Sequence, residues 1–475
     1  MTTPWPRAAP TAAERGAYSD AVVRPFWLDG LPRGAECPPL DDAAETDLCV
    51  VGGGFTGLWA ALLAKARGPA RDVTLLEADA CGAGASGRNG GFLIASLTHG
   101  LENGLSRFPQ EMETLERLGH DNYRDLREDL RRHAVDCEFE ETGELSVAVA
   151  DHELEEIPAE AEQLRAFGHE IEVFDAERMR AEVASPTYCG GIWDRTGAAL
   201  VHPGKLAHGL RDAALRAGVH VHEHSPVTGM DAAGTGVSLS AAGGSVDARR
   251  VLLATSAYPP LVRSIRRYVL PVYDYVLVTE PLGTARREAI GWRRRQGLGD
   301  RGNQFHYYRL TADDRILWGG YDAVYRYGGP VGAHLDDHDA TFAKLSQHFF
   351  TTFPQLDGIR FTHRWGGAID TCSRFSVFFG TALGGRVAYA TGYTGLGVAS
   401  SRFGAQVALD LADGHDTEAT RLSYVRRRPV PFPPEPLRSA VVRLTQNRMA
   451  AADRDGGRRG LWLRALDRAG LGFDS

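Results

Sequence analysis

Gly-Gly-Gly-Phe-Thr-Gly at residues 52–57 has the spacing GxGxxG, and the segments around it decide the fold. An apolar run at 48–51 predicts a short buried strand, residues 58–67 predict a helix, and residues 73–77 predict a second strand that ends at Glu77. The glycines allow a tight turn and a close approach to a pyrophosphate at the helix N-terminus, and Glu77 can accept hydrogen bonds from a ribose. The pattern therefore predicts an α/β protein with a βαβ dinucleotide-binding unit.

Two glycine-rich stretches further along the chain favour FAD over a nicotinamide dinucleotide. Residues 82–92, GAGASGRNGGF, predict a flexible loop that suits the ribityl chain and the edge of a flavin. Residues 392–397, GYTGLG, follow an apolar strand predicted at 387–391 and open a helix that ends near residue 412. The positive end of such a helix could stabilise negative charge on a reduced isoalloxazine ring.

The order of these motifs, with Ala-Thr at 254–255 ending a further predicted strand, resembles the D-amino-acid-oxidase superfamily of FAD-dependent oxidoreductases. The loop at 82–92 is most similar to the branch of γ-glutamylputrescine oxidases and aminophosphonate oxidoreductases. The resemblance implies a Rossmann-like FAD-binding domain of the glutathione-reductase type, with an inserted α+β substrate domain built on a mainly antiparallel sheet. The FAD contacts that it implies are Gly52, Gly54, Phe55, Thr56, Gly57, Glu77, Ala78, Ser86, Arg88, Asn89, Gly90, Gly91, Val227, Thr255, Gly392, Thr394, Gly395, Leu396 and Gly397.

The same resemblance gives the expected attachment of FAD and the domain boundaries. Some members of the superfamily link FAD to a cysteine before the last strand. Cys372 lies in roughly that region, but its spacing to Gly392 is shorter than such a link requires, so we expect non-covalent FAD. The expected organisation is an N-terminal extension at 1–46, a discontinuous FAD-binding domain at 47–100, 190–262 and 366–420, a substrate domain at 101–189 and 263–365, and a basic C-terminal tail with short helices at 421–475.

The resemblance further implies oxidation of a C–N bond in a small amine. A hydride would pass from the carbon beside the amine nitrogen to flavin N5, water would hydrolyse the imine, and O2 would reoxidise the flavin to give H2O2. Two alternatives stay open, an NAD(P)H-dependent flavin monooxygenase and an amine dehydrogenase that uses another acceptor. The strand at 317–321 lacks the lysine that speeds oxygen use in sarcosine-oxidase-type enzymes, which keeps the dehydrogenase open.

Aromatic and basic residues of the inserted sheet are the candidates for the substrate pocket. A row of aromatic rings could hold a cationic amine. Arg309 is the best candidate in this region to bind an anionic group of a substrate. The predicted pocket residues are Tyr273, Tyr275, Arg309, Tyr321 and Trp365, with His306, Tyr307 and Trp318 as further members.

Charge and composition limit the partners. The net charge is −8, yet residues 421–475 carry 12 arginines against 5 acidic residues, and a basic tail beside an acidic body most simply docks on that body. The chain has no apolar run of about 18 residues, and its six cysteines form no CxxC pair, which suits a reducing cytoplasm. We expect a small-molecule amine as partner, a monomer or homodimer, and no metal, nucleic acid or membrane.

Overall fold

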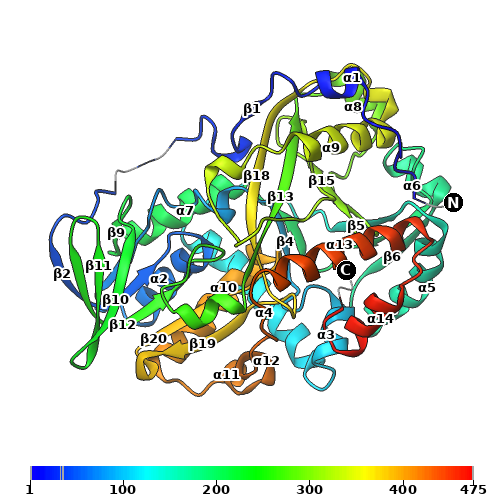
Figure 1. Ribbon diagram of the computed structural model, residues 1–475. Coiled ribbons are helices and arrows are strands. Elements are labelled where there is room, and N and C mark those ends of the chain that lie inside the picture. Colours follow the sequence, from blue (N-terminus) through cyan, green and yellow to red (C-terminus); the bar gives the residue numbers. More distant parts are fainter. Residues whose placement is uncertain (1–2, 33, 35–36, 473–475) are drawn as a thin grey trace.

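The computed structural model describes residues 3–32, 34 and 37–472, and within them the strands form two large sheets joined by helices (Figure 1). The smaller sheet has eight described strands in the order β10-β11-β12-β2-β3-β9, with β20 paired to β12 and β19 paired to β20. Its core strands are parallel, and β10, β11 and β12 form the antiparallel meander that the sequence predicts at 219–248. The strands are β2 (Ala43–Val51), β3 (Val73–Leu76), β9 (His220–His222), β10 (Val227–Ala233), β11 (Gly236–Ala241), β12 (Ser245–Leu253), β19 (Phe378–Ala382) and β20 (Val387–Thr391).

Three helices cover this smaller sheet: α2 (Phe55–Arg67), α7 (Pro203–Arg216) and α10 (Gly397–Asp413). Of these, α2 and α10 follow the two glycine-rich turns from which the sequence predicts them. The second half of β2 and all of β3 and β20 are buried on both faces and are mostly apolar, as is typical of parallel strands under helices. Helix α2 packs so closely on the turn before it that a Cβ on Gly57 would lie 1.8 Å from the carbonyl oxygen of Gly52. A glycine at position 57 is therefore a requirement of packing.

The larger sheet has ten described strands in the order β1-β18-β13-β16-β15-β14-β5-β7-β6, with β17 also paired to β13. All of its pairings are antiparallel except β1 with β18 and β14 with β5, which confirms the predicted α/β fold with an inserted, mainly antiparallel α+β domain. The strands are β1 (Val22–Val23), β5 (Glu144–Ala148), β6 (Ile171–Asp175), β7 (Gly190–Asp194), β13 (Leu270–Thr279), β14 (Gly297–Asp300), β15 (His306–Leu310), β16 (Ile316–Gly320), β17 (Val324–Tyr325) and β18 (Phe361–Thr371).

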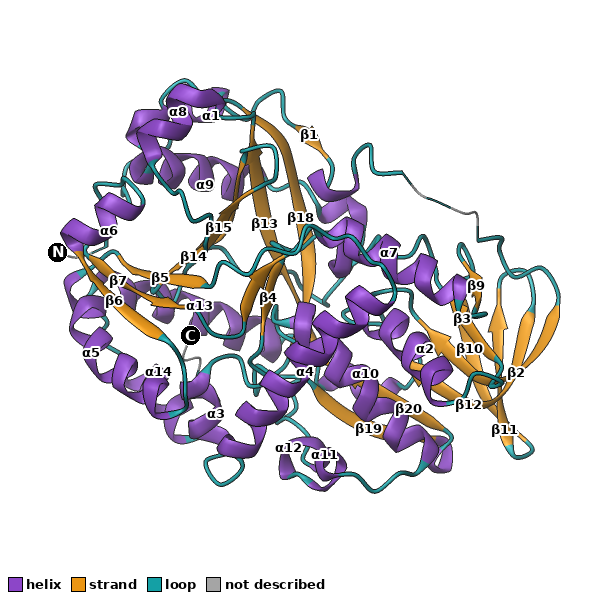
Figure 2. Ribbon diagram, turned by 180° about the vertical axis from the view of Figure 1, so that it is seen from behind, coloured by secondary structure: helices purple, strands orange, loops and turns teal. Residues whose placement is uncertain are grey.

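The helices around the larger sheet lie at its outer side and ends, as Figure 2 shows from behind. Strand β18 crosses the boundary expected at residue 366, and β7 begins at the boundary expected at residue 190 while pairing within the larger sheet. The helices are α1 (Ala12–Gly16), α5 (Asp151–Ala166), α6 (Ala176–Glu182), α8 (Gly283–Ile290) and α9 (Asp339–Thr352). None of the described helices combines the length and apolar character that crossing a bilayer requires.

A second group of helices joins the two sheets. It includes α3 (Leu101–Arg107) and α4 (Met112–Arg132), which are separate helices because Pro109 disfavours helical backbone before it. A two-stranded ribbon of β4 (Phe92–Ile94) and β8 (Ala198–Leu200) lies between the sheets. The C-terminal helices are α11 (Glu418–Arg421), α12 (Ser423–Arg426), α13 (Leu437–Arg454) and α14 (Leu461–Arg468), and the 18-residue α13 is longer than the short helices expected there.

The N-terminal extension packs into the body through two tryptophans. Trp27 is only 1% exposed, and its indole N–H donates to the carbonyl oxygen of Asn89 at 2.8 Å. The ring of Trp5 lies 4.6 Å from that of His306 and 4.7 Å from that of His348, within the larger domain. The extension is therefore part of the folded core, and its last residues begin β2.

Candidate dinucleotide and substrate site

A cavity of about 960 Å³ lies between the two sheets. Its lining comes from the loops at the carboxyl ends of β2, β3, β12 and β20, from the inner face of the larger sheet, and from the C-terminal segment. The carboxyl ends of parallel strands are where open α/β sheets bind their ligands. We call this space the central cavity.

The first end of the central cavity is built by the glycine turn and Glu77. Gly52 has φ +109°, and a Cβ there would lie 2.5 Å from the carbonyl oxygen of Ala254. The Glu77 carboxylate accepts the N–H of Gly53 at 2.6 Å and that of Asp79 at 2.9 Å, so it is held at the cavity wall. Burial raises the pKa of Glu77. A carboxylate in this position can still accept hydrogen bonds from a ribose with its remaining lone pairs.

The loop at 82–92, expected to be flexible, is a fixed wall of the central cavity. The Arg88 guanidinium forms an ion pair with Asp336 at 2.5 Å and donates to the Ala83 carbonyl oxygen at 2.8 Å. Indole N–H groups of Trp365 and Trp27 donate to the backbone carbonyls of Arg88 and Asn89. The loop is fixed and not flexible because two tryptophans, both distant from it in sequence, form hydrogen bonds with its backbone carbonyl groups.

The start of α10 closes the middle of the central cavity. Buried Asp370 accepts the backbone N–H of Gly392 at 2.6 Å and the Thr391 hydroxyl at 3.2 Å, and burial raises its pKa to about 6. These bonds hold the turn before α10, whose first N–H groups have no partner within the helix. The turn thus presents donors and a positive dipole end to the cavity.

Most of the residues expected to contact a dinucleotide line this one cavity. The exceptions are Gly57, Gly91 and Gly392, which shape the backbone behind it. Gly91 and Gly392 have φ of +78° and +85°, which L side chains rarely adopt. The expected residues in the wall are Gly52, Gly54, Phe55, Thr56, Glu77, Ala78, Ser86, Arg88, Asn89, Gly90, Val227, Thr255, Thr394, Gly395, Leu396 and Gly397.

Cys372 does not line the central cavity. Its side chain is fully buried, and its thiol contacts the carbonyl oxygens of Ser376 at 3.2 Å and Gly392 at 3.4 Å. Burial raises the pKa of this thiol, which disfavours the nucleophilic thiolate. Cys372 therefore packs behind the turn that leads to α10.

The expectation of a tyrosine row from β13 needs correction, because side chains alternate between the faces of a strand. Val272, Asp274 and Val276 line the central cavity, whereas Tyr273 and Tyr275 point to the opposite face. There the Tyr273 hydroxyl contacts the backbone of Gly332, and the Tyr275 hydroxyl donates to the Leu335 carbonyl oxygen at 3.0 Å. These two tyrosines hold the loop before α9 and do not reach the cavity.

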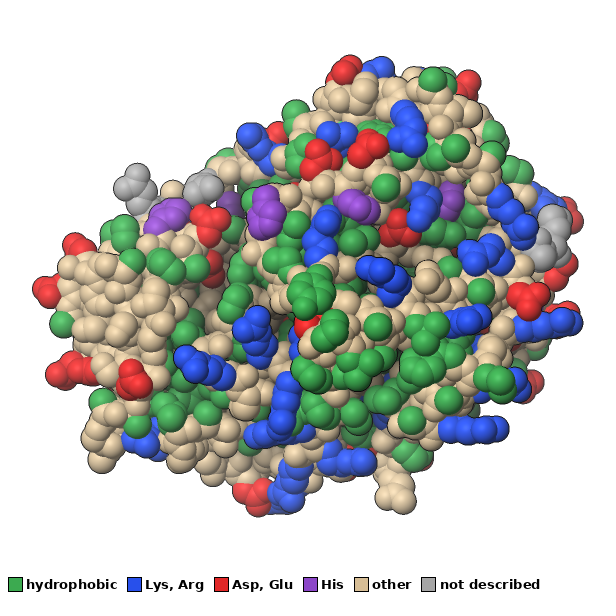
Figure 3. Space-filling model, viewed as in Figure 1, with side chains coloured by type: hydrophobic (Ala, Val, Ile, Leu, Met, Phe, Trp, Pro, Cys, Tyr) green, Lys and Arg blue, Asp and Glu red, His purple; other side chains and the backbone are tan. Residues whose placement is uncertain are grey.

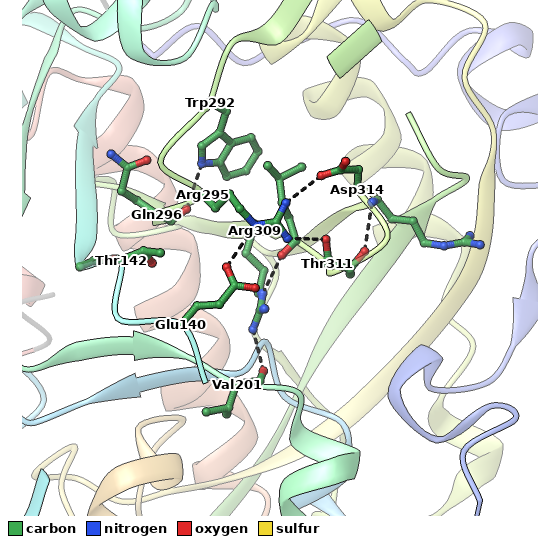
Figure 4. A network of polar contacts seen from close by, with 12 residues as sticks. Glu140, Thr142, Val201, Trp292, Arg295, Gln296, Arg309, Thr311 and Asp314 are labelled. Carbon is green, nitrogen blue, oxygen red and sulfur yellow. Dashed lines mark hydrogen bonds and ion pairs between the residues drawn. The ribbon is translucent and has the colours of Figure 1, made fainter. Parts of the chain in front are cut away.

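Arg309 and Trp365 also lie outside the wall of the central cavity. The Arg309 side chain is fully buried and donates to the Val201 carbonyl oxygen at 2.6 Å, in a polar network with Arg295 and Glu140 close by (Figure 4). Burial lowers the pKa of Arg309 to about 10. Its place between the larger sheet and the start of α7 is structural, so the expected anion anchor is not in the pocket.

Of the aromatic candidates, Tyr307 and Tyr321 line the central cavity. Asp274 also lines it, although no acidic residue was predicted there from the sequence. The Tyr307 hydroxyl donates to the Asp274 carboxylate at 2.5 Å. Burial raises the pKa of Asp274 to about 6, although the hydrogen bond from Tyr307 opposes that shift. A Cβ built on Gly90 would lie 2.7 Å from the Tyr307 ring, so this pair adjoins the loop at 82–92.

Asp274 could have been found from its strand alone. It is the single charged residue in the ten-residue strand β13, and it shares a face with Val272 and Val276. A charge in such a strand carries a large desolvation cost unless it is paired or used. His306 and Trp318, by contrast, are buried away from the cavity, and His306 bonds to Asp300 at 2.7 Å.

A possible ligand set for a metal lies elsewhere, although the sequence predicts no metal. Glu116, His120 and His169 place one ligand atom each within 4.8 Å of one another. Burial alone would lower the pKa of His169, but its hydrogen bonds to Asp194 and Glu116 raise it to about 9. At neutral pH His169 is therefore an ion-paired cation, which competes with metal binding.

Together, the two sheets and the cavity between them define an α/β protein of the dinucleotide-binding type. The FAD dependent oxidoreductase family matches residues 47–411, and the chain belongs to that family. It is an FAD-dependent oxidoreductase by that membership. Escherichia coli gamma-glutamylputrescine oxidoreductase is 33% identical over 403 residues, 83% of this chain and 89% of that protein.

Other relatives extend the likeness over most of the chain. Haemophilus influenzae probable oxidoreductase OrdL is 28% identical over 423 residues, 87% of this chain and 93% of that protein. Glycine oxidase from Geobacillus kaustophilus superposes with a TM-score of 0.66 at 19% identity, over 81% of this chain and 99% of that chain. L-proline dehydrogenase from P. horikoshii gives 0.64 at 17% identity, over 79% and 95%. These solved structures confirm the fold.

Proposed function

We propose that this protein oxidises a C–N bond of a small amine with non-covalent FAD in the central cavity. The relatives support the reaction, since the names of gamma-glutamylputrescine oxidoreductase, glycine oxidase and L-proline dehydrogenase all specify nitrogen compounds. The cavity supports the cofactor, because Glu77, the Gly52 turn and the start of α10 fit a ribose, a pyrophosphate and a flavin in one continuous space. The buried Cys372 thiol supports non-covalent binding.

The Asp274–Tyr307 pair is the observation that carries the proposal. Substrate amines are protonated at neutral pH, and a cation entering an apolar wall needs an anionic partner. The Asp274 carboxylate would bind the ammonium group and take its proton, since a neutral nitrogen is required before the neighbouring carbon can be oxidised. The Tyr307 hydroxyl holds the carboxylate in place and stabilises its ionised form.

FAD, when bound, supplies the two-electron acceptor for the hydride of that carbon, and O2 would complete the cycle to give H2O2. The chain supplies the surroundings. Val272, Val276 and Tyr307 would shield the reacting groups from water, and the fixed loop at 82–92, which adjoins Tyr307, would hold the cofactor edge. Water then hydrolyses the released imine without further help from the protein.

Anaerobic mixing of the yellow holoenzyme with amines, amino acids and polyamines tests the proposal. At least one amine should bleach the flavin absorbance, acid precipitation should release FAD into solution, and oxygen uptake should follow in air. Bleaching by NADPH without any amine would instead favour a monooxygenase. Bleaching without oxygen uptake would leave a dehydrogenase.

Asp274→Asn sharpens the test through pH. Because Asp274 must be ionised, the wild-type rate constant for flavin reduction should fall as pH drops through about 6, the pKa of this group. Asp274→Asn should lower that rate constant by about 100-fold and remove its fall at low pH, which we call the acidic limb. Asp313→Asn is a matched control, because that carboxylate lies outside the central cavity and pairs with Arg315 at 2.6 Å. An unchanged limb in Asp274→Asn would contradict the assigned role.

A further inference from the structure

The C-terminal segment, residues 430–472, forms the outer wall of the central cavity. It begins after the family match ends at residue 411. Side chains at helical spacing on α13 face the cavity, and they continue into α14 and its end. The residues of α13 in the wall are Arg438, Val441, Val442, Thr445, Gln446 and Met449.

Two carboxylates fasten this wall to the larger domain. Glu435, just before α13, accepts the hydroxyl of Tyr325 at 2.5 Å and the N–H of Gly328 at 3.2 Å. Asp453, near the end of α13, accepts the backbone N–H groups of Asn303 and Gln304, both at 3.0 Å. Because it is held near both ends, α13 is a built part of the cavity and not a loosely attached tail.

The two sides of α13 differ in chemistry. The outward side carries exposed Arg443, Leu444 and Arg448, and Figure 3 shows arginines and hydrophobic side chains together on this face of the molecule. The inward side alternates apolar Val441, Val442 and Met449 with polar Arg438, Thr445 and Gln446. Arg438 and Thr445 donate to the carbonyl oxygens of Pro433 and Val441, both at 2.9 Å, and Gln446 carries an amide. That amide donates to the Ala323 carbonyl oxygen and is therefore engaged by the larger domain.

Because the polar groups of α13 already have partners within the protein, its apolar side chains and the Asp274 carboxylate are what this part of the cavity offers a substrate. The ammonium group would meet Asp274, and a chain of methylene groups would lie along α13, where the burial of apolar area favours binding. We propose that α13, chiefly through Met449, selects amines by the length of the alkyl chain beyond the reacting nitrogen and favours an unbranched chain of several carbons. This inference rests on the proposed function for the placement of the ammonium group at Asp274.

The test compares n-hexylamine with ethylamine on the anaerobic holoenzyme. The measured quantity is the half-saturating amine concentration for any change in flavin absorbance, whether a spectral shift or bleaching. Met449→Trp, which fills the cavity, should raise that concentration about tenfold or more for n-hexylamine and much less for ethylamine. Met449→Ala, which enlarges the cavity, should not discriminate against n-hexylamine. Leu444→Trp and Leu444→Ala on the exposed side are matched controls and should leave both amines unchanged.

The outcomes separate this inference from the proposed function. Equal changes for both amines in Met449→Trp, or the same selectivity in Leu444→Trp, would overturn the role of α13. A wild-type protein that does not respond to n-hexylamine would overturn it as well. A saturable spectral shift without bleaching by any amine would refute amine oxidation and leave the assignment of the wall in place.

Discussion

The part of the central cavity proposed to hold the dinucleotide, at the Gly52 turn, and the part proposed to hold the substrate, at Asp274, depend on different features of the sequence. We call them the dinucleotide side and the substrate side. On the dinucleotide side, glycines at fixed spacing set the backbone within a few residues of the ligand, as at Gly52 and Gly54. On the substrate side, the wall depends on which face of β13 and β15 turns inward and on α13, which follows more than 150 residues after β13. Local chemistry decides the first side, whereas strand register and a remote segment decide the second.

The two sides should therefore respond differently to substitution. A change on the dinucleotide side meets rigid backbone and should affect folding and cofactor content together. A change on the substrate side meets side chains that can be exchanged, and it should affect rates and specificity while FAD stays bound. Three substitutions measure this difference, from the largest expected effect to the smallest.

Gly57→Ala should have the largest effect. Its Cβ would lie 1.8 Å from the Gly52 carbonyl oxygen, so α2 or the turn must shift. Such overpacking against backbone costs about 3 kcal/mol or more, and the displaced turn should also lose FAD. Urea unfolding and the ratio of flavin to protein absorbance measure both effects. Gly68→Ala at the end of the same helix is the control, since its Cβ would find its nearest neighbour at 3.7 Å. If Gly57→Ala and Gly68→Ala lost the same stability and the same amount of FAD, the proposed difference between the two sides of the cavity would be wrong.

Arg309→Met should destabilise the fold by about 2 kcal/mol, because it removes a buried donor from the Val201 carbonyl oxygen. The half-saturating concentrations of an anionic and a neutral amine should nevertheless keep their ratio. Urea unfolding and amine titration of the same preparation test the two statements, and Arg443→Met on the exposed side of α13 controls for loss of a surface charge. If Arg309→Met weakened the binding of the anionic amine alone, Arg309 would belong to the substrate site after all.

The sequence predicts the fold correctly, and most residues that it assigns to the dinucleotide line one cavity, because both depend on short-range patterns. One can recognise the buried run before Gly52, the position of Glu77 and the turn before α10 without knowing which strands lie beside them. The substrate side is less predictable for physical reasons. Tyr273 and Asp274 are adjacent, and only the register of β13 decides which one faces the cavity.

The C-terminal wall is harder still to predict. Charge predicts that residues 421–475 dock on the body. The described part, up to residue 472, packs there, but the place of docking depends on the contacts of Glu435 and Asp453 with loops far away in sequence. The tryptophans that fix the loop at 82–92 are remote in the same sense, since Trp365 follows it by more than 270 residues. Long-range contacts of this kind leave no local signal in the sequence.

Tyr307→Phe should have the smallest effect and is the most informative about the substrate side. The Tyr307 hydroxyl stabilises ionised Asp274, so its removal should raise the pKa of that carboxyl. A hydrogen bond to a charged group contributes about 1.5 kcal/mol, which corresponds to about one pKa unit. The acidic limb of flavin reduction should therefore move from about pH 6 to higher pH, while the rate constant at pH 9 and the FAD content stay close to wild type.

Tyr308→Phe provides the control within the same strand. The Tyr308 hydroxyl bonds to that of Tyr188 at 2.8 Å on the opposite face of β15, outside the central cavity. Its loss should leave the limb where it is, because no charge in the cavity depends on it. If both variants shift the acidic limb equally, the pKa of the titrating group responds to a general loss of packing in the sheet, and Asp274 is not the base. If only Tyr307→Phe shifts it, the face of β15 that turns inward determines the proton chemistry, which is the dependence on register that distinguishes this side from the glycine turn.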